Sequence, residues 1–440
     1  IVHLIKKFKV EPRHLLAITY TEKAAKELKN RVIEKVGAKA HFMTVNTFHA
    51  FCYKILRDND FNTKQLLDES EAVHMFLTRF DELKPFESTE FPLDPQRAIT
   101  ESFMPFFNRM RDELIDPEKI IVPQLKDDAT LTRETCQQLS DLKRIYPLFE
   151  SWKKELNVVD YGDMILSAYQ MISTNKSILK NIQDNYRHIV IDEFQDNNFA
   201  LNEIVNLIAG KRNYVTAVGD DDQVIYSFRG ANNFNIQAFR ERYGDHEKYQ
   251  SIALETNYRS NQAILDLANE SIKNNPERVE KTLTSYLKAG GEKPVRFWGE
   301  KSQQLDYLIN EILHLNSEGI RCKDIAVLCR THGQATIVMD ALSRSGIPTI
   351  PHYMGLLNCS GVKDIIAWCQ VIADGSHQDS AMYRIIYNNL GKKFAYEIFS
   401  KFKRNDRNTR HDLIKNDKSI RQKYPKIVTI LSTITKLKDA

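Results

Sequence analysis

The sequence predicts an α/β protein built on parallel sheets, with helical insertions between the sheet-forming segments. Two short apolar runs, at 189–191 and 215–218, flank a stretch in which apolar residues recur at helical spacing. A strand, a helix and a strand in this order make the two strands parallel. In contrast, residues 60–161 contain no glycine and are dominated by helical repeats. The chain therefore combines sheet regions with a helical region.

Size and charge bound the class of protein only loosely. The chain has 440 residues, of which 42% are hydrophobic, enough for two or more domains with sizeable cores. The net charge is only +4, but residues 1–40 carry ten Lys and Arg against four Glu, and residues 391–440 carry fourteen against five acids. Such runs are usually solvated faces, and by themselves they only weakly favour a polyanionic partner.

Several function classes are disfavoured by what the sequence lacks. The six cysteines show no CxxC pair and no Cys/His spacing typical of zinc, which favours reduced structural thiols. No apolar run reaches transmembrane length, and no signal peptide is visible. We therefore expect a cytoplasmic protein with no membrane partner.

Acidic residues follow directly after both strands of the central unit. Asp192 and Glu193 end the first run, and residues 220–222 end the second. Ligands of parallel sheets bind at the carboxyl ends of the strands, where these acids lie. Asp192 can hold Mg²⁺ on nucleotide phosphates, and Glu193 can orient or deprotonate a water aimed at the γ-phosphate. Gln195 and Gln223 can register whether that phosphate is present. A lone Asp-Glu pair has an equally ordinary alternative, a loop carboxylate pair or a helix cap.

The wider pattern separates these alternatives. Asp-Glu-Phe-Gln-Asp at 192–196, Gly-Asp-Asp-Asp-Gln at 219–223 and Tyr-Ser-Phe-Arg-Gly-Ala at 226–231 resemble motifs II and III of superfamily 1 DNA helicases of the UvrD/Rep type. The resemblance implies tandem RecA-like domains and a motor that uses ATP and Mg²⁺. It also implies travel on single-stranded DNA in the 3′ to 5′ direction, unwinding at single-strand/duplex junctions, and repair or replication proteins as partners.

Near the amino terminus, Leu15–Thr19 is expected to form a buried strand, followed by an amphipathic helix that Thr21 caps. This segment resembles motif Ia of the same helicases, where Tyr20 would line a base pocket. Residues 45–51 resemble the family's Thr-Phe-His motif. There Thr47 would hold a DNA phosphate, while Phe48 and His49 are weaker DNA contacts, since such residues are more often core or hydrogen-bonded structural groups.

The aromatic and basic block after motif III is the main expected DNA contact. Tyr226 and Phe228 alternate with small or polar residues and can face a strand together, and Arg229 adds a phosphate contact. Base–aromatic stacking contributes about 1–3 kcal/mol per base and tolerates any sequence. Phe228 occupies a position where many relatives have Trp. Gln223 lies on the same loop, so its movement on loss of γ-phosphate would also move the rings.

A further strand is expected at 252–254, followed by Glu-Thr-Asn-Tyr-Arg-Ser at 255–260, which resembles motif IV. There Arg259 would stabilise charge on the transferred phosphoryl group, and Tyr258 would stack near the adenine. The resemblance assigns four residues to nucleotide binding: Gln195, Asp220, Tyr258 and Arg259. It assigns four to catalysis: Asp192, Glu193, Gln223 and Arg259. Arg330, after another expected strand, ranks below Arg259.

The domain boundaries follow from these blocks. We expect a first RecA-like domain at 1–65 plus 181–258, a helical accessory insertion at 66–180, a partial second RecA-like domain at 259–376 and the start of a second helical insertion at 377–440. In the first insertion the acids of 160–164 are expected to cap a helix at 164–171. In the second domain we expect strands at 294–298, 325–329 and 346–353, and helices at 302–315, 335–345 and 362–372.

Two expected parts of such a motor are missing from the sequence. It contains no GxxxxGK[ST] phosphate loop and none of the family's late motifs, and it begins with Ile. Without the loop's amides and lysine, ATP binding should be very weak. We therefore interpret the chain as an internal piece of a helicase. Two other interpretations stay open: the motor portion of a helicase–nuclease subunit of the RecB/AddA kind, and a non-catalytic scaffold that binds single-stranded DNA.

Overall fold

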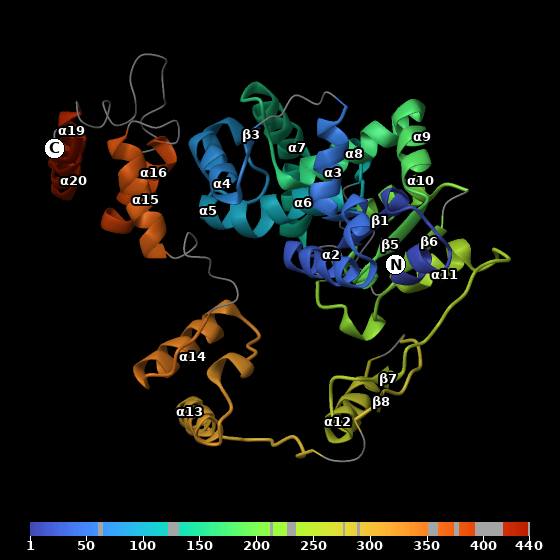
Figure 1. Ribbon diagram of the computed structural model, residues 1–440. Helices are drawn as coiled ribbons and strands as arrows, with labels where there is room; N and C mark the ends of the chain where they lie inside the picture. Colours follow the sequence, from blue (N-terminus) through green and yellow to red (C-terminus); the bar gives the residue numbers. More distant parts are fainter. Residues whose placement is uncertain are drawn as a thin grey trace. The chain divides into compact units, whose positions relative to one another are not determined.

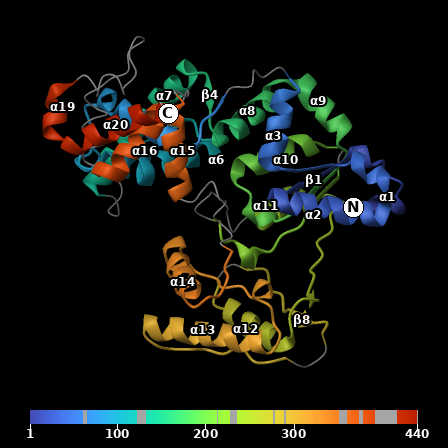
Figure 2. The ribbon, with the colours of Figure 1, turned by 60° about the vertical axis from the view of Figure 1, so that its left-hand side comes forward.

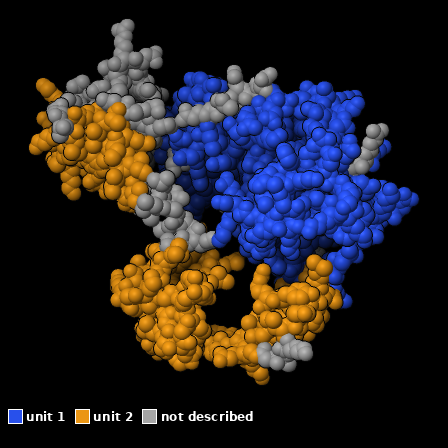
Figure 3. Space-filling view, in the orientation of Figure 1, with its two compact units in different colours: residues 1–253, 275–280, 396–403 blue, residues 254–274, 281–395, 404–440 orange. Residues whose placement is uncertain are grey.

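The computed structural model describes residues 1–59, 65–121, 132–211, 214–226, 235–275, 278–287, 291–350, 360–373, 378–391 and 417–438. The chain divides into two compact units, coloured separately in Figure 3. Unit 1 comprises residues 1–253, 275–280 and 396–403, and unit 2 comprises residues 254–274, 281–395 and 404–440.

Unit 1 contains a four-stranded parallel sheet in the order β2-β1-β5-β6 (Figure 1). Its strands are β1 Leu15–Thr19, β2 Thr44–Thr47, β5 His188–Ile191 and β6 Tyr214–Ala217. Ile18 pairs with Ile191, and Ile191 pairs with Ala217, so the three strands end level with one another. The predicted strand–helix–strand unit is confirmed, and it brings its acidic residues to one edge of the sheet.

The two faces of this sheet have separate cores because side chains alternate along each strand. Leu16 and Ile18 pack with α3, α8, α9 and α10 on one face. Leu15 packs with α1 and α2 on the other. Figure 2 shows these two helix layers above and below the strands. The helices are α1 Val2–Lys6, α2 Glu22–Val36, α3 Phe48–Arg57, α8 Tyr161–Thr174, α9 Lys176–Asn185, α10 Phe199–Ala209 and, after β6, α11 Asn235–Tyr243.

The predicted helix caps are confirmed. The hydroxyl of Thr21 accepts a hydrogen bond from the backbone N–H of Ala24 at 3.1 Å, which begins α2. Asp160 and Asp163 form a reciprocal capping box at the start of α8, each accepting from the other's backbone N–H. Such caps satisfy amides that a helix cannot bond internally, so the chain direction at both helix starts is set locally.

The glycine-poor region forms a helical subdomain with an aromatic core. Its elements are α4 Glu69–Thr78, α5 Pro95–Arg97, a π-helical turn Ala98–Phe103, α6 Met104–Asp112 and α7 Arg133–Glu155, with a short parallel pair β3 Gln65–Leu66 and β4 Val158–Val159. Phe76, Phe107 and Phe149 stack or tilt against one another within 6.0 Å between ring centroids. The sequence predicted the helices but not the β3–β4 pair.

A buried cluster of charges joins this subdomain to α8. The guanidinium of Arg111, at the end of α6, donates to Asp160 at 2.5 Å and to Asp163 at 2.9 Å. The ammonium of Lys153 donates to Asp163 at 2.6 Å. Burial alone would lower the pKa of Arg111, but the charges of Asp160 and Asp163 outweigh it and raise that pKa. The capping acids therefore have a second role, which is to hold α6 and α7 against α8.

The next residue of α6 makes a different link. Asp112 accepts a hydrogen bond from the side-chain amide of Asn198 at 2.6 Å. Asn198 in turn caps α10 by accepting from the backbone N–H of Leu201 at 2.9 Å. Arg111 and Asp112, at the end of α6, therefore connect the helical subdomain to the caps of α8 and α10.

Unit 2 is mostly helical in the described ranges. Its elements are β7 Thr256–Asn257, α12 Gln262–Ile272, β8 Thr284–Ser285, α13 Lys301–Ser317, α14 His332–Arg344, α15 Ser360–Ile372, α16 Gln378–Leu390, α19 Lys418–Lys423 and α20 Pro425–Lys438. The helices expected at 302–315, 335–345 and 362–372 are confirmed as α13, α14 and α15. None of the helices that the structure describes is both long and apolar enough to cross a membrane.

The strands expected in this part of the chain are wrong. Residues 252–254, 294–298, 325–329 and 347–350 have no strand partner in the structure, and 351–353 lie outside the described residues. The pairing nearest to these runs is β7 with β8, two residues long. Many apolar side chains of the runs are exposed, with Leu254 at 78%, Trp298 at 74% and Leu328 at 94%, whereas Ile347 is buried at 5%. An apolar run indicates a strand only where neighbouring strands and covering helices are available to bury it.

Candidate functional site

The carboxyl ends of β5 and β6 meet in two tight loops. The backbone N–H of Asp192 donates to the carbonyl of Ile18 at 2.9 Å, and that of Phe194 donates to the carbonyl of Val218 at 2.9 Å. These bonds extend the sheet ladder into the loops. The Asp192 carboxyl is half-buried, and burial followed by the neighbouring charge of Glu193 raises its pKa. The two adjacent acids at the sheet edge therefore favour a protonated Asp192 more than an isolated surface aspartate would.

Glu193 has an unusual backbone. It lies in the left-handed region with φ 51° and ψ 46°, which costs a residue with a side chain about 1 kcal/mol or more. The ladder bond of Phe194 fixes the chain immediately after it. The turn directs Glu193 to the exposed side of the loop while Phe194, the following residue, is buried.

A chain of hydrogen bonds connects Glu193 to the second loop. The side-chain amide of Gln195 donates to Glu193 Oε2 at 2.8 Å, and Gln195 Oε1 accepts from the backbone N–H of Asp220 at 3.0 Å. Asp220 Oδ2 accepts from the side-chain amide of Gln223 at 2.6 Å. Gln195 is only 2% exposed, so its two bonds are shielded from water. Sequence reasoning selected these four residues, and the structure brings them into one network.

Gly219 makes this approach possible. A Cβ atom at this position would lie 2.7 Å from Gln195 Oε1 and 3.2 Å from its backbone nitrogen. The first separation is shorter than real Cβ contacts and the second is tighter than most, so a side chain here would force Gln195 to shift. Glycine therefore allows the close approach of the two loops.

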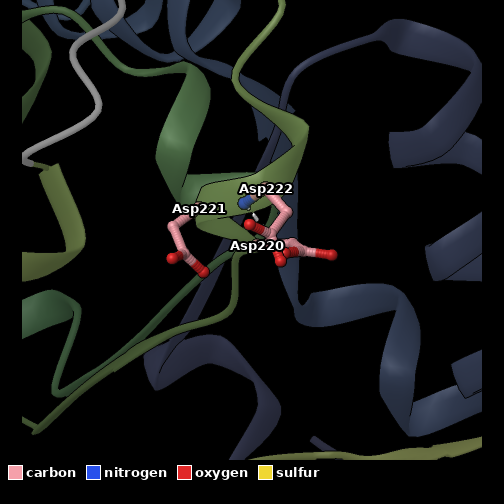
Figure 4. Close-up of side chains that lie close together, drawn as sticks. All are labelled: Asp220, Asp221 and Asp222. Carbon is pink, nitrogen blue, oxygen red and sulfur yellow. Dashed lines mark hydrogen bonds between the residues drawn. The ribbon is translucent and has the colours of Figure 1, made fainter. Parts of the chain in front are cut away.

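The acidic turn after β6, residues 220–222, is drawn in Figure 4. Its three carboxylates lie close enough to share a cation. The backbone N–H of Asp222 donates to Asp220 Oδ1 at 3.1 Å. Asp222 forms an ion pair with Arg278 at 2.9 Å, and Asp221 accepts from the backbone N–H of Val279 at 2.6 Å. Each acid therefore already takes at least one donor from the protein.

One aromatic contact joins two predicted DNA-binding residues. The rings of Tyr20, just after β1, and Tyr226, in the loop after the acidic turn, stack with centroids 4.9 Å apart and planes at 25°. Both rings are partly exposed. The other two residues of this predicted block, Phe228 and Arg229, lie outside the described residues.

The motif IV residues lie in unit 2. Asn257 ends β7, and its side-chain oxygen accepts from the backbone N–H groups of Arg259 at 2.9 Å and Ser260 at 2.8 Å. This turn leaves Tyr258 and Arg259 exposed. Tyr258 lies against Tyr286, which follows β8, with ring centroids 4.7 Å apart. Tyr286 is an aromatic neighbour that the sequence pattern did not single out.

Comparison with known families matches both parts of the chain. Residues 1–244 match the model of the UvrD/REP helicase N-terminal domain, and residues 252–434 match the model of the UvrD-like helicase C-terminal domain. The chain belongs to the UvrD/REP helicase family. Its fold is therefore that of two RecA-like helicase domains with helical insertions, as the sequence predicted.

Two curated UvrD/REP relatives extend the comparison. The chain is 29% identical over 402 residues to the ATP-dependent DNA helicase PcrA of Staphylococcus epidermidis, covering 88% of this chain and 51% of that protein. It is 29% identical over 401 residues to the ATP-dependent DNA helicase PcrA of Staphylococcus aureus, with the same coverage. The chain thus spans about half the length of the curated relatives it matches.

In this UvrD/REP chain the chemistry of the sheet edge fits a magnesium ion. Mg²⁺ prefers carboxylate and water oxygens. Asp192 presents such an oxygen in a half-buried position where a negative neighbour already raises its pKa, so a cation would relieve that repulsion. A bound Mg²⁺ would supply Lewis-acid polarisation of phosphate oxygens.

The Thr-Phe-His residues occupy different environments. Thr47 is 8% exposed, and its hydroxyl caps α3 by accepting from the backbone N–H of Ala50 at 3.3 Å. Phe48 is 4% exposed and packs in the core, so its assignment as a DNA contact is replaced by a packing role. His49 is exposed and meets Tyr161 edge to face at 5.8 Å between centroids.

Sequence reasoning missed Asn235, which begins α11. Its side-chain amide donates to the backbone carbonyls of Gln195 at 3.1 Å and Asn197 at 2.6 Å. Its oxygen accepts from the side chain of Asn202 at 2.9 Å. At 6% exposure this network is buried and fixes the backbone of motif II. The hint in the sequence is an asparagine at the first position of a helix, where such a residue is ordinarily a cap.

Proposed function

We propose that the protein containing this chain is an ATP-dependent DNA helicase that moves along single-stranded DNA and unwinds duplex at its junctions. In this proposal Asp192 holds Mg²⁺, Glu193 accepts a proton from the attacking water, and Arg259 with Tyr258 binds the phosphate and base of ATP. The proposal extends to 3′ to 5′ travel, work on nucleoid DNA in the cytoplasm, and repair or replication proteins as partners, which the sequence resemblance implies.

The observation that carries the proposal is the hydrogen-bond chain from Glu193 through Gln195 and Asp220 to Gln223. Only three positions separate Gln223 from Tyr226, whose ring stacks on Tyr20. A group that senses the nucleotide and a ring that can stack on a base therefore share one short loop. This is the physical link that a translocating motor needs between hydrolysis and strand movement.

The first test replaces the acid in the complete protein. Glu193→Gln keeps the acceptor for Gln195 but cannot take a proton, so we expect DNA-stimulated ATP hydrolysis to fall by about 100-fold or more, while ATP and single-stranded DNA still bind. Glu247→Gln, at an exposed position, is the matched control. Wild-type protein that binds single-stranded DNA without hydrolysing ATP would identify a scaffold and refute the motor.

The second test addresses the link between the two activities. Gln223→Ala removes the donor to Asp220, so we expect nucleotide binding to persist while hydrolysis no longer drives strand movement. The measurement compares ATP turnover with duplex unwound by the complete protein. Unchanged unwinding by this variant would show that the loop does not transmit the nucleotide state.

A further inference from the structure

The segment between α12 and β8 has a distinctive place in the chain. Residues 275–280 belong to unit 1, although α12 before them and β8 after them belong to unit 2. Residues 275–280 therefore interrupt the sequence of unit 2 and pack as part of unit 1. Its described residues on this excursion are Asn275 and 278–280.

The contact is specific. Arg278 places two guanidinium nitrogens on Asp222, with Nε 3.0 Å from Oδ1 and Nη2 2.9 Å from Oδ2. The next residue, Val279, donates its backbone N–H to Asp221 at 2.6 Å. The side chains of Arg278 and Asp222 are 16% and 11% exposed. A two-pronged arginine–carboxylate pair fixes orientation as well as distance, which a lysine cannot do.

The acidic turn is itself attached to the candidate active site. Asp222 donates its backbone N–H to Asp220, and the backbone N–H of Asp220 donates to Gln195. Gln195 holds Glu193. The hydrogen-bonded path from Arg278 therefore ends at the proposed catalytic acid.

On its other side, the segment leads to motif IV. The first ladder residue of β8 follows Val279 by five positions, and β8 pairs with β7. The hydroxyl of Ser285 donates to the carbonyl of Ser260 at 2.7 Å, and the backbone N–H of Tyr286 donates to the carbonyl of Asn257 at 2.8 Å. These bonds support the turn that presents Tyr258 and Arg259.

We propose that Arg278 is a positioning residue that ties the chain behind motif IV to the acidic turn of motif III. A change in the Glu193–Gln195–Asp220 network then shifts Asp222, and Arg278 passes that shift along the chain to β8 and the motif IV turn. This inference rests on the proposed function, because it assigns a path along the chain from the proposed catalytic acid to the motif IV turn.

The activity test uses the complete protein with three changes: Arg278→Met, Arg278→Lys, and the exchange Arg278→Asp with Asp222→Arg. We expect Arg278→Met to bind Mg-ATP and single-stranded DNA normally but to travel about tenfold less far per ATP hydrolysed, the size of a typical coupling between sites. We expect Arg278→Lys to travel further per ATP than Arg278→Met, and the swapped double variant to travel further still. Lys273→Met, which removes an exposed pair with Glu270, is the control.

A second measurement needs no turnover. Amide hydrogen exchange in the 440-residue chain should speed up in Arg278→Met both at Asp222 and at Tyr286. Faster exchange confined to the acidic turn, or unchanged travel per ATP, overturns the inference. A wild-type protein that never hydrolyses ATP refutes the proposed function instead, and the exchange result then still decides whether Arg278 links the two turns.

Discussion

Two clusters of arginine and aspartate lie in unit 1, and they differ in their access to water. In the buried cluster Arg111 is 1% exposed and its partner Asp160 is 10% exposed. In the acidic turn Arg278 and Asp222 are 16% and 11% exposed, and the neighbouring Asp221 is partly exposed. A fully buried ion pair loses several kcal/mol when one partner leaves, whereas a pair near solvent loses little. The better-buried first cluster should therefore hold the helical subdomain more firmly than the second cluster holds the acidic turn.

The largest expected effect breaks the buried cluster. Arg111→Met leaves Asp160 and Asp163 with Lys153 as their one remaining cation in the cluster, so we expect unfolding free energy to fall by about 3–5 kcal/mol. Urea unfolding of the chain measures the change. Arg31→Met, at an exposed arginine paired with Glu27, should be close to neutral. If Arg111→Met and Arg31→Met lose the same unfolding free energy, the buried cluster does not stabilise the chain more than an exposed ion pair does.

An intermediate effect is expected in the uncharged network beside motif II. Asn235→Asp keeps the size of the side chain but removes both donors to the carbonyls of Gln195 and Asn197. A buried acceptor left without its donor costs about 1–3 kcal/mol. We expect that loss in urea unfolding, together with a lower maximal rate of ATP hydrolysis in the complete protein. Asn181→Asp, at an exposed amide, is the control, and equal stability of the two variants would argue against a positioning role for Asn235.

The smallest effect depends on pH. Burial raises the pKa of Asp112 to about 6 despite the Arg111 and Arg109 charges and the hydrogen bond from Asn198. Because an unfolded aspartate has a pKa of about 3.9, the folded chain holds this proton more tightly. Protonated Asp112 therefore stabilises the folded chain fully below about pH 4, and this stabilisation is lost as the pH rises through about 6.

Asp112→Asn should remove this part of the pH dependence while keeping an oxygen for Asn198. The expected change is about 1 kcal/mol across this window, after allowance for partial exposure of the group. Thermal unfolding at several pH values measures it. Asp196, whose pKa burial and Glu193 also raise to about 6, retains its own contribution in both proteins. An unaltered slope in the variant would contradict the assignment.

What the sequence predicted correctly depends on local rules. Asp192 and Asp220 could be placed together because parallel strands end at the same edge of a sheet. Thr21 and Asp160 could be recognised as caps because a cap and its helix are neighbours in the chain. The fold class followed from the same reasoning, and family membership supports it.

The remaining features depend on partners far away in the sequence. Arg111 meets Asp160 across 49 positions, and Arg278 meets Asp222 across 56. No spacing rule announces such pairs. The strands expected at 294–298 and 325–329 failed for the same reason, because an apolar run does not reveal whether another strand is available beside it. Local pattern therefore predicted elements, while tertiary partners decided which polar groups form the site.

The stacked rings of Tyr20 and Tyr226, with centroids 4.9 Å apart, already cover one face of each other. Bases along a strand are spaced about 3.4 Å apart, so a base entering between the rings would need their centroids about 7 Å apart. If the two rings bind DNA as proposed, an incoming base would first have to separate this pair, whose attraction is worth about 0.5–1.5 kcal/mol. Under the proposed function, each ring of this pair would therefore compete with a DNA base for the face of the other ring.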